Sequence, residues 1–252
     1  DVMVYATVST GFKSGGFTGS ATTAQIATTA FDPEEAINYE IGAKLDLFDR
    51  RLRLNTSAFY LDYSDLQVTR FFQPVGSPFG EFITENAANA EIKGVEVELT
   101  ARPVEWLEFG GSYAYLDAKY KDFFGTPDIS GISDFTDNTM RQAPENVWSA
   151  YVQLTHELPS GGMLTANVSG RYQGKVFTNA DNNPLDVIES YTLGDAWVSW
   201  RSSDSQWELQ AWVKNFTDEV WGTHVYTQRG NRMAFGTFGP PRQYGLTLTF
   251  EY

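Results

Sequence analysis

The sequence has no cysteine among its 252 residues. This absence excludes a disulfide framework and any chemistry that needs a thiolate. Basic residues are scarce as well, since 18 Lys and Arg stand against 32 Asp and Glu and give a formal net charge of -14. Because nucleic-acid phosphates demand an excess of Lys and Arg, this balance argues against a nucleic-acid partner.

Long apolar runs are also missing. No stretch of 18 apolar residues occurs, and the first residues do not combine a basic segment with an apolar one. We therefore expect neither a transmembrane helix nor a signal peptide in this sequence. The mean hydropathy of -0.33 is typical of a soluble protein. It leaves a membrane β-barrel open, however, because only every second residue of a barrel strand meets lipid.

Many segments of the sequence alternate strictly between apolar and polar residues. The final stretch YGLTLTFEY (244–252) places five large apolar side chains on one face and Gly, Thr and Glu on the other. Such alternation is the pattern of a β-strand with one apolar face. The same pattern predicts about ten strands, at 2–11, 34–48, 51–68, 90–102, 106–121, 146–158, 163–177, 188–201, 206–216 and 242–252.

The connections between these strands alternate in length along the chain. Four short turns lie at 49–50, 103–105, 159–162 and 202–205, and between them come long connections at 12–33, 69–89, 122–145, 178–187 and 217–241. An up-and-down antiparallel barrel with tight turns at one end and long loops at the other gives this rhythm. Aromatic residues also gather near strand ends, as in the girdles of membrane barrels, at Trp106, Trp148, Phe177, Trp200, Trp207, Tyr244 and Tyr252.

Seven segments in this order resemble the C-terminal barrel of TonB-dependent outer-membrane receptors of the siderophore type. They are VYATVSTGFKSGGF (4–17), EEAINYEIGAKLDLFDRRLRLNTSAFYLDYSDLQV (34–68), NAEIKGVEVELTARP (89–103), LEFGGSYAYLDAKYKDF (107–123), APENVWSAYVQ (143–153), VKNFTDE (213–219) and GPPRQYGLTLTFEY (239–252). The resemblance covers nearly the whole chain.

The resemblance implies an all-β fold in which residues 1–252 form the last part of a transmembrane barrel of roughly 22 strands. It also implies a plug domain and a TonB box, neither of which is in these residues, and a location in the bacterial outer membrane. The function that it implies is TonB-dependent uptake of a scarce nutrient, most often a ferric siderophore, without covalent chemistry or a cofactor. Outer-membrane lipid, the barrel-assembly machinery, the receptor's own plug and TonB are the implied partners.

Two segments are candidates for ligand contact in the extracellular loops. The first contains Phe12, Lys13 and Phe17, and the resemblance implies that it lies near the ligand. The alternative is that the glycines of this segment simply allow the chain to turn. The second is the last long loop, where the planar guanidinium forks of arginine suit carboxylate, catecholate or hydroxamate oxygens and aromatic rings offer stiff contact. Its candidates are Trp221, Tyr226, Arg229 and Arg232, and the alternative is ordinary loop packing or contact with lipopolysaccharide.

The terminal strand matches the signal that the barrel-assembly machinery recognises, according to the same resemblance. The matching residues are Tyr244, Leu246, Leu248, Phe250 and Tyr252. The alternative is that these side chains simply face lipid, and both roles are compatible.

Catalytic and metal sites are poorly supported. The two histidines, His156 and His224, are expected at opposite ends of the barrel and cannot share a site with a nucleophile. Asp181 and Asn183 could open a calcium loop, but Leu185 and Asp186 stand where a ligand and a glycine are needed. The sequence therefore predicts no enzyme and no metal site, and it leaves two other functions open: a small complete porin-like channel and a soluble β-structure that binds a partner.

Overall fold

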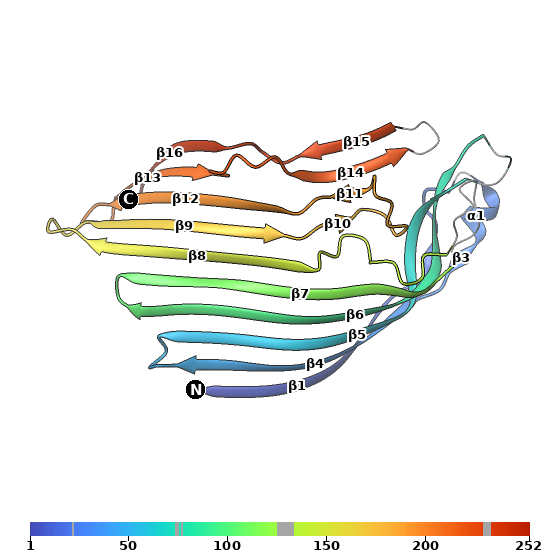
Figure 1. The fold of residues 1–252 in the computed structure, drawn as a ribbon, viewed down its shortest axis with the longest axis horizontal. Coiled ribbons are helices and arrows are strands. Elements are labelled where there is room, and N and C mark those ends of the chain that lie inside the picture. Colours follow the sequence, from blue (N-terminus) through green and yellow to red (C-terminus); the bar gives the residue numbers. More distant parts are fainter. Residues whose placement is uncertain (22, 74–75, 77, 125–133, 229–232) are drawn as a thin grey trace.

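One antiparallel sheet of ten long strands forms the body of the protein in the computed structural model, which describes all residues except 22, 74–75, 77, 125–133 and 229–232. Neighbouring strands follow one another in chain order, and β1 and β16 form the two edges (Figure 1). The strands are β1 (Val2–Lys13), β4 (Glu34–Leu47), β5 (Leu52–Phe72), β6 (Glu81–Val104), β7 (Leu107–Phe123), β8 (Asn146–Glu157), β9 (Met163–Gln173), β12 (Tyr191–Arg201), β13 (Trp207–Lys214) and β16 (Gln243–Phe250). The predicted class, a portion of an antiparallel barrel with about ten strands, is confirmed.

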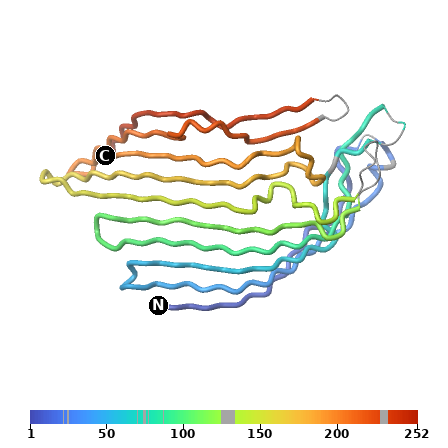
Figure 2. The backbone as a smooth tube through the Cα atoms, in the orientation of Figure 1, coloured from blue at the N-terminus to red at the C-terminus, as the bar shows by residue number. Residues whose placement is uncertain are grey.

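The two ends of the sheet differ as the loop rhythm predicted. Both termini and the four short turns lie at one end, which we call the turn end, and the long connections lie at the other, the loop end (Figures 1 and 2). The turn between β4 and β5 uses left-handed residues, since Phe48, Asp49 and Arg50 have φ of 53, 55 and 65°.

The register keeps apolar and polar side chains on separate faces from strand to strand. Leu246 is paired with Ala211, Ala211 with Val198 and Val198 with Ala166, so these residues share one face, the apolar face. On the opposite, polar face the pairing aligns Thr247 with Gln210 and Gln210 with Ser199. A one-residue slip would exchange the two faces, so the alternation of the sequence fixes the register.

Aromatic pairs lie on the apolar face near the strand ends. Trp148 stacks on Tyr172 with 6.1 Å between ring centroids, and Tyr39 lies 6.3 Å from Tyr60. Trp207 and Phe250 make a closer pair, at 4.6 Å, near the turn end. Direct cross-strand neighbours of this kind add stability beyond the area they bury. Phe177 departs from the expected position, because it lies in the short loop strand β10 (Val176–Phe177) and not in β9.

The predicted connection 69–89 is wrong in its extent. Strands β5 and β6 continue as a paired hairpin to Phe72 and from Glu81, and we call the part beyond residue 64 of β5 and before residue 90 of β6 the arm. The arm bends away from the direction of the other strands (Figure 2). Its register shifts between Tyr63 and Gln67, where Asp65 has a φ of 55°. These shifts lie inside the predicted strand 51–68, so alternation missed only the outer part of the arm, 69–72 and 81–89. On β6 a further register shift, between Asn89 and Ala90, breaks the period where the predicted strand 90–102 begins.

Shorter elements complete the loop end. They are β2 (Gly16–Phe17), α1 (Ala24–Thr28), β3 (Ala30–Phe31), β10, β11 (Val187–Ile188), β14 (Gly222–Gln228) and β15 (Met233–Phe238). The last loop, predicted as irregular at 217–241, therefore contains a hairpin of β14 and β15. No helix in the described ranges is both long and apolar enough to cross a membrane.

Buried apolar side chains gather at the loop end, on the polar side of the sheet. One cluster consists of Val68, Ala88, Ala90, Tyr120 and Phe123, and the other of Val176, Ile188, Tyr191 and Leu193. Phe135 and Ala180 pack on the first cluster, and Trp221 and Val225 pack on the second. The outer loops thus fold over the polar face there, and we call this region the mouth.

Candidate functional site

The first candidate segment lies at the loop end of β1. Phe12 shares the face of Val4 and Val8, the apolar face, and is 78% exposed. Lys13 has the opposite parity, and its exposed side chain therefore belongs to the polar face. Phe17 stands in β2 and is 60% exposed. The structure separates these candidates by face, and the position of Phe12 favours an aromatic girdle.

A pair of amide side chains holds this first loop to the arm. Gln67 and Asn86 face each other in the register of β5 and β6. Gln67 Nε2 donates to the carbonyls of Ser14 and Asp32, at 2.9 and 3.0 Å. Asn86 accepts from the Asp32 amide at 2.6 Å and donates to the carbonyl of Asp65, at 2.7 Å. Both ends of the loop are therefore tied to the bend of the arm.

Trp221 occupies the mouth at the other side of the sheet, beside β12. Its ring centroid lies 5.0 Å from that of Tyr191, and its carbonyl accepts the Gly239 amide at 2.9 Å. The Arg171 guanidinium lies 5.4 Å from the centre of the indole ring. A Cβ on Gly239 would come within 1.9 Å of this ring, so glycine is required there. Trp221 is consequently a packing residue that supports its neighbours.

Tyr226 lies in β14 on the face opposite to Val225, which packs on the second cluster. Alternation along the strand therefore directs Tyr226 away from that cluster. Arg229 and Arg232, the remaining candidates of this loop, lie outside the described residues. Lys13 lies in β1 and Phe17 in the short sheet of β2 and β3, whereas Trp221 lies beside β12, so the described members of the two candidate groups are not brought together.

Polar contacts join the remaining outer loops into one layer. Asp186, which is fully buried, accepts from Thr227 Oγ1 at 2.5 Å and from Asn179 Nδ2 at 2.9 Å. Asn182 and Thr139 exchange two bonds of 2.8 Å across 43 residues of sequence. Sequence reasoning missed these contacts, because single Asn, Thr or Asp residues in a loop carry no periodic signal.

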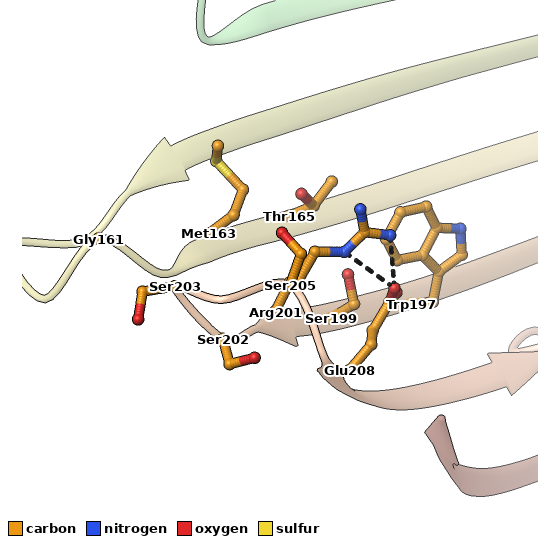
Figure 3. A pocket seen from close by; sticks show the side chains of 10 residues that line it. All are labelled: Gly161, Met163, Thr165, Trp197, Ser199, Arg201, Ser202, Ser203, Ser205 and Glu208. Carbon is orange, nitrogen blue, oxygen red and sulfur yellow. Dashed lines mark hydrogen bonds and ion pairs between the residues drawn. The ribbon is translucent and has the colours of Figure 1, made fainter. Parts of the chain in front are cut away.

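A depression of about 370 Å³ opens on the polar face near the turn end (Figure 3). Arg201 crosses it and pairs with Glu208, with Nη2 2.8 Å from Oε2. Trp197 and Thr165 line the same depression. The neighbouring turn is held by Asp204, whose carboxylate accepts from Ser202 Oγ and from the Gln206 amide, at 2.5 and 3.1 Å. These two bonds lower the pKa of Asp204.

The two histidines lie apart from one another in the fold, and the Asp181 loop forms polar turns. His156 lies in β8 at the turn end, and His224 lies in β14 at the loop end. Asp181 accepts from the Asn183 amide and Asn183 from the Leu185 amide, which is the geometry of successive polar turns. Within the described part of the chain, no three His, Cys, Asp or Glu side chains gather closely enough to hold a metal ion.

The terminal strand β16 pairs with β13 along its whole length. Tyr244, Leu246 and Leu248 are 81, 74 and 64% exposed, because they point outward from an edge strand. Phe250 ends the strand, and Tyr252 follows it beyond the last sheet pair. The five residues predicted as an assembly signal therefore form one apolar row, which is also what contact with lipid alone would require.

A comparison with protein families decides the identity of this sheet. The family model described as TonB dependent receptor-like, beta-barrel, matches residues 1–216. This chain belongs to the TonB-dependent receptor family. The predicted resemblance is thereby confirmed, and the predicted location holds, because members of this family are outer-membrane β-barrels. They are receptors and transporters, not enzymes.

Relatives of this TonB-dependent receptor barrel agree with the family match. The ferrichrome outer membrane transporter and phage receptor of Escherichia coli is 27% identical over 227 residues, which are 88% of this chain and 27% of the relative. The metal-pseudopaline receptor of Pseudomonas aeruginosa is 33% identical over 119 residues, 47% of this chain and 15% of the relative.

Solved structures share the fold. The ferric yersiniabactin uptake receptor of Yersinia pestis superposes with a TM-score of 0.82 at 19% identity, over 100% of this chain and 35% of that receptor. The siderophore receptor PiuA of Acinetobacter baumannii gives a TM-score of 0.73 at 22% identity, over 100% and 34%. The chain thus spans about a third of these receptors, and less of the curated relatives.

Proposed function

We propose that this chain is the C-terminal part of the barrel of a receptor for TonB-dependent uptake of a ferric siderophore. The family match over residues 1–216 carries this proposal. The relatives support the ligand class, since they include receptors for ferrichrome and for ferric yersiniabactin. The iron chelate is cargo in this reading and not a resident cofactor.

The two faces of the sheet suit two different environments. The apolar face has the alternating rows that outer-membrane lipid requires, and backbone groups in lipid must be paired within a closed barrel. The polar face would line the lumen and form hydrogen bonds with a plug domain, which in turn responds to TonB. The turn end would then face the periplasm and the loop end the outside.

The mouth is where we place ligand contact. Lys13 and Phe17 remain proposed contacts at the first loop, and Trp221, Tyr226, Arg229 and Arg232 at the last, whereas Phe12 fits an interfacial position better. We also propose that the row of Tyr244, Leu246, Leu248, Phe250 and Tyr252 is recognised by the barrel-assembly machinery.

Uptake by cells tests the function. A strain that lacks its own ferrichrome and ferric yersiniabactin receptors is given the complete receptor, and accumulation of each radiolabelled ferric complex is measured with and without a proton uncoupler. We expect saturable uptake of at least one complex that stops when the uncoupler is added. Linear uptake that the uncoupler does not affect would indicate the porin-like channel instead, and no uptake of either complex would contradict the ligand class.

A further inference from the structure

Arg171 differs from the other arginines on the polar side of the sheet. Towards the turn end, Arg53 pairs with Asp46 at 2.8 Å, Arg201 with Glu208 at 2.8 Å and Arg102 with Glu108 at 3.0 Å. Arg171 lies nearer the mouth and forms no ion pair with any residue that the structure describes. The donors of its guanidinium are therefore not taken up by an acidic side chain of the described residues.

Aromatic packing holds this guanidinium in place. Arg171 lies 5.4 Å from the centre of the Trp221 ring. The indole is itself fixed by Tyr191, at 5.0 Å, and by the Gly239 backbone. Tyr191 is fixed in turn, because its hydroxyl donates to Gln173 Oε1 at 3.1 Å. A stacked guanidinium is preorganised, so it loses less conformational freedom when it binds a ligand.

The surroundings of Arg171 form a small recess. The sheet register aligns Ser149, Arg171 and Leu193 in one row, and Tyr151, Ser169 and Asp195 in the next row toward the turn end. These six residues line a depression of about 260 Å³. Asp195 brings a negative charge to it, but its Oδ1 accepts the Asn215 amide at 2.8 Å. The Tyr151 hydroxyl donates to Glu108 Oε1 at 2.9 Å, and the Ser149 hydroxyl is hydrogen-bonded to that of Ser112 at 2.8 Å. Arg171 is therefore the main donor of the recess toward the lumen.

We propose that Arg171, supported by Trp221, is a contact for anionic oxygens of the cargo on the inner wall below the mouth. A guanidinium binds paired, negatively charged oxygens through its planar fork, so the recess would favour ferric chelates with net negative charge, such as a tris-catecholate. A ferric tris-hydroxamate is neutral by charge balance and would gain little from Arg171. This inference rests on the proposed uptake of ferric siderophores. It adds a preference for negatively charged chelates and assigns that preference to Arg171.

Arg171→Gln in the complete receptor tests the proposal. Binding of a ferric tris-catecholate and of a ferric tris-hydroxamate is measured by fluorescence quenching on receptor in outer membranes. Because hydrogen bonds to charged groups are the strong ones, we expect roughly tenfold to hundredfold weaker binding of the anionic probe. Binding of the neutral probe should stay within about twofold. A higher salt concentration should reduce the difference in affinity for the anionic probe between wild type and variant.

Three further variants control this test. Arg201→Gln removes a paired guanidinium near the turn end and should change neither affinity. Trp221→Leu removes the ring beside the guanidinium. It should weaken binding of the anionic probe less than Arg171→Gln does. Arg171→Lys keeps the charge without the planar fork and should restore part of the anionic affinity, which separates a binding role from a structural one.

The outcomes separate this proposal from the function on which it rests. Wild-type receptor that binds neither probe contradicts the siderophore function itself. Wild-type binding that Arg171→Gln leaves unchanged, or lowers equally for both probes, overturns the role of Arg171 while the uptake function stands.

Discussion

Glycine lies under an aromatic ring at four directly paired positions of the polar face. In each pair, a Cβ added to the glycine would come within 2.9 Å of the ring of its cross-strand partner. The pairs are Tyr5 with Gly42, Phe59 with Gly94, Tyr151 with Gly110 and Trp212 with Gly245. Each ring therefore covers backbone that a strand glycine would otherwise leave exposed, an arrangement that also helps to fix the register.

Gly110→Ala tests the requirement for these glycines. The new methyl group would lie 2.7 Å from the Leu99 carbonyl oxygen and 2.8 Å from the Tyr151 ring. Because a carbonyl in a sheet cannot move aside, we expect a loss of about 1–3 kcal/mol in the free energy of unfolding. Thermal conversion of the folded band in electrophoresis measures the change. Gly11→Ala is the control, since nothing lies within 4 Å of its added Cβ, and an equal loss in both variants would contradict the packing argument.

Asn215 closes the base of the last outer loop. Its buried side chain accepts from the Glu219 amide at 2.9 Å and donates to the carbonyls of Glu219 and Pro240, at 2.9 and 3.3 Å. Its φ of 50° is also a conformation that Asn adopts more readily than Ala.

Asn215→Ala should therefore lower the free energy of unfolding by about 1–3 kcal/mol, because buried polar groups lose their partners. Hydrogen exchange at the Glu219 amide should accelerate in the same variant. Asn55→Ala removes a single exposed contact of 3.4 Å and should cost less than about 0.5 kcal/mol. Unchanged exchange at Glu219 would show that Asn215 does not hold the loop.

The turn between β12 and β13 contains a carboxylate, that of Asp204, which makes the stability of the turn depend on pH. Hydrogen bonds from Ser202 and the Gln206 amide lower the pKa of Asp204 in the folded state. Because folding lowers this pKa, the ionised carboxylate stabilises the folded state above the pKa of the unfolded chain. This stabilisation is lost as the pH falls through the pKa of the folded state. We expect the Asp204 carboxyl signal in an NMR titration to move at lower pH than that of an unfolded peptide. Ser202→Ala should raise this midpoint, and an unshifted midpoint would contradict the bond.

Elements with one apolar face were predictable from the sequence, and those without one were not. β4 and β8 begin at the predicted residues, because their alternation starts where the sheet separates two environments. The outer part of the arm escaped prediction, since on β6 a register shift beside Asn89 breaks the period. Among the candidate site residues, Trp221 was chosen from its residue type. Its contact with Arg171 could not be predicted, because it joins positions 50 apart in sequence.

At the scale of the whole molecule, the described residues place no second layer beneath most of the sheet. The two clusters of buried residues that the structure describes lie at the mouth, where loops cover the polar face. Elsewhere the apolar face presents large exposed side chains, among them Val4, Val8, Val168 and Leu246. Such a face marks a contact with an apolar partner, and for a member of an outer-membrane family we propose that this partner is lipid.

Two tryptophans on β12 make this assignment measurable. Trp200 pairs with Leu164 and Leu209 on the apolar face, whereas Trp197 pairs with Asn167 and Trp212 on the polar face. In variants of the complete receptor that retain only one of these two indoles, lipids brominated on their acyl chains should quench Trp200 strongly and leave Trp197 almost unaffected. Because the two residues are three positions apart on one strand, they differ in face far more than in depth. Equal quenching of both would mean that the apolar rows do not face acyl chains, and strong quenching of Trp197 alone would mean that the two faces are exchanged.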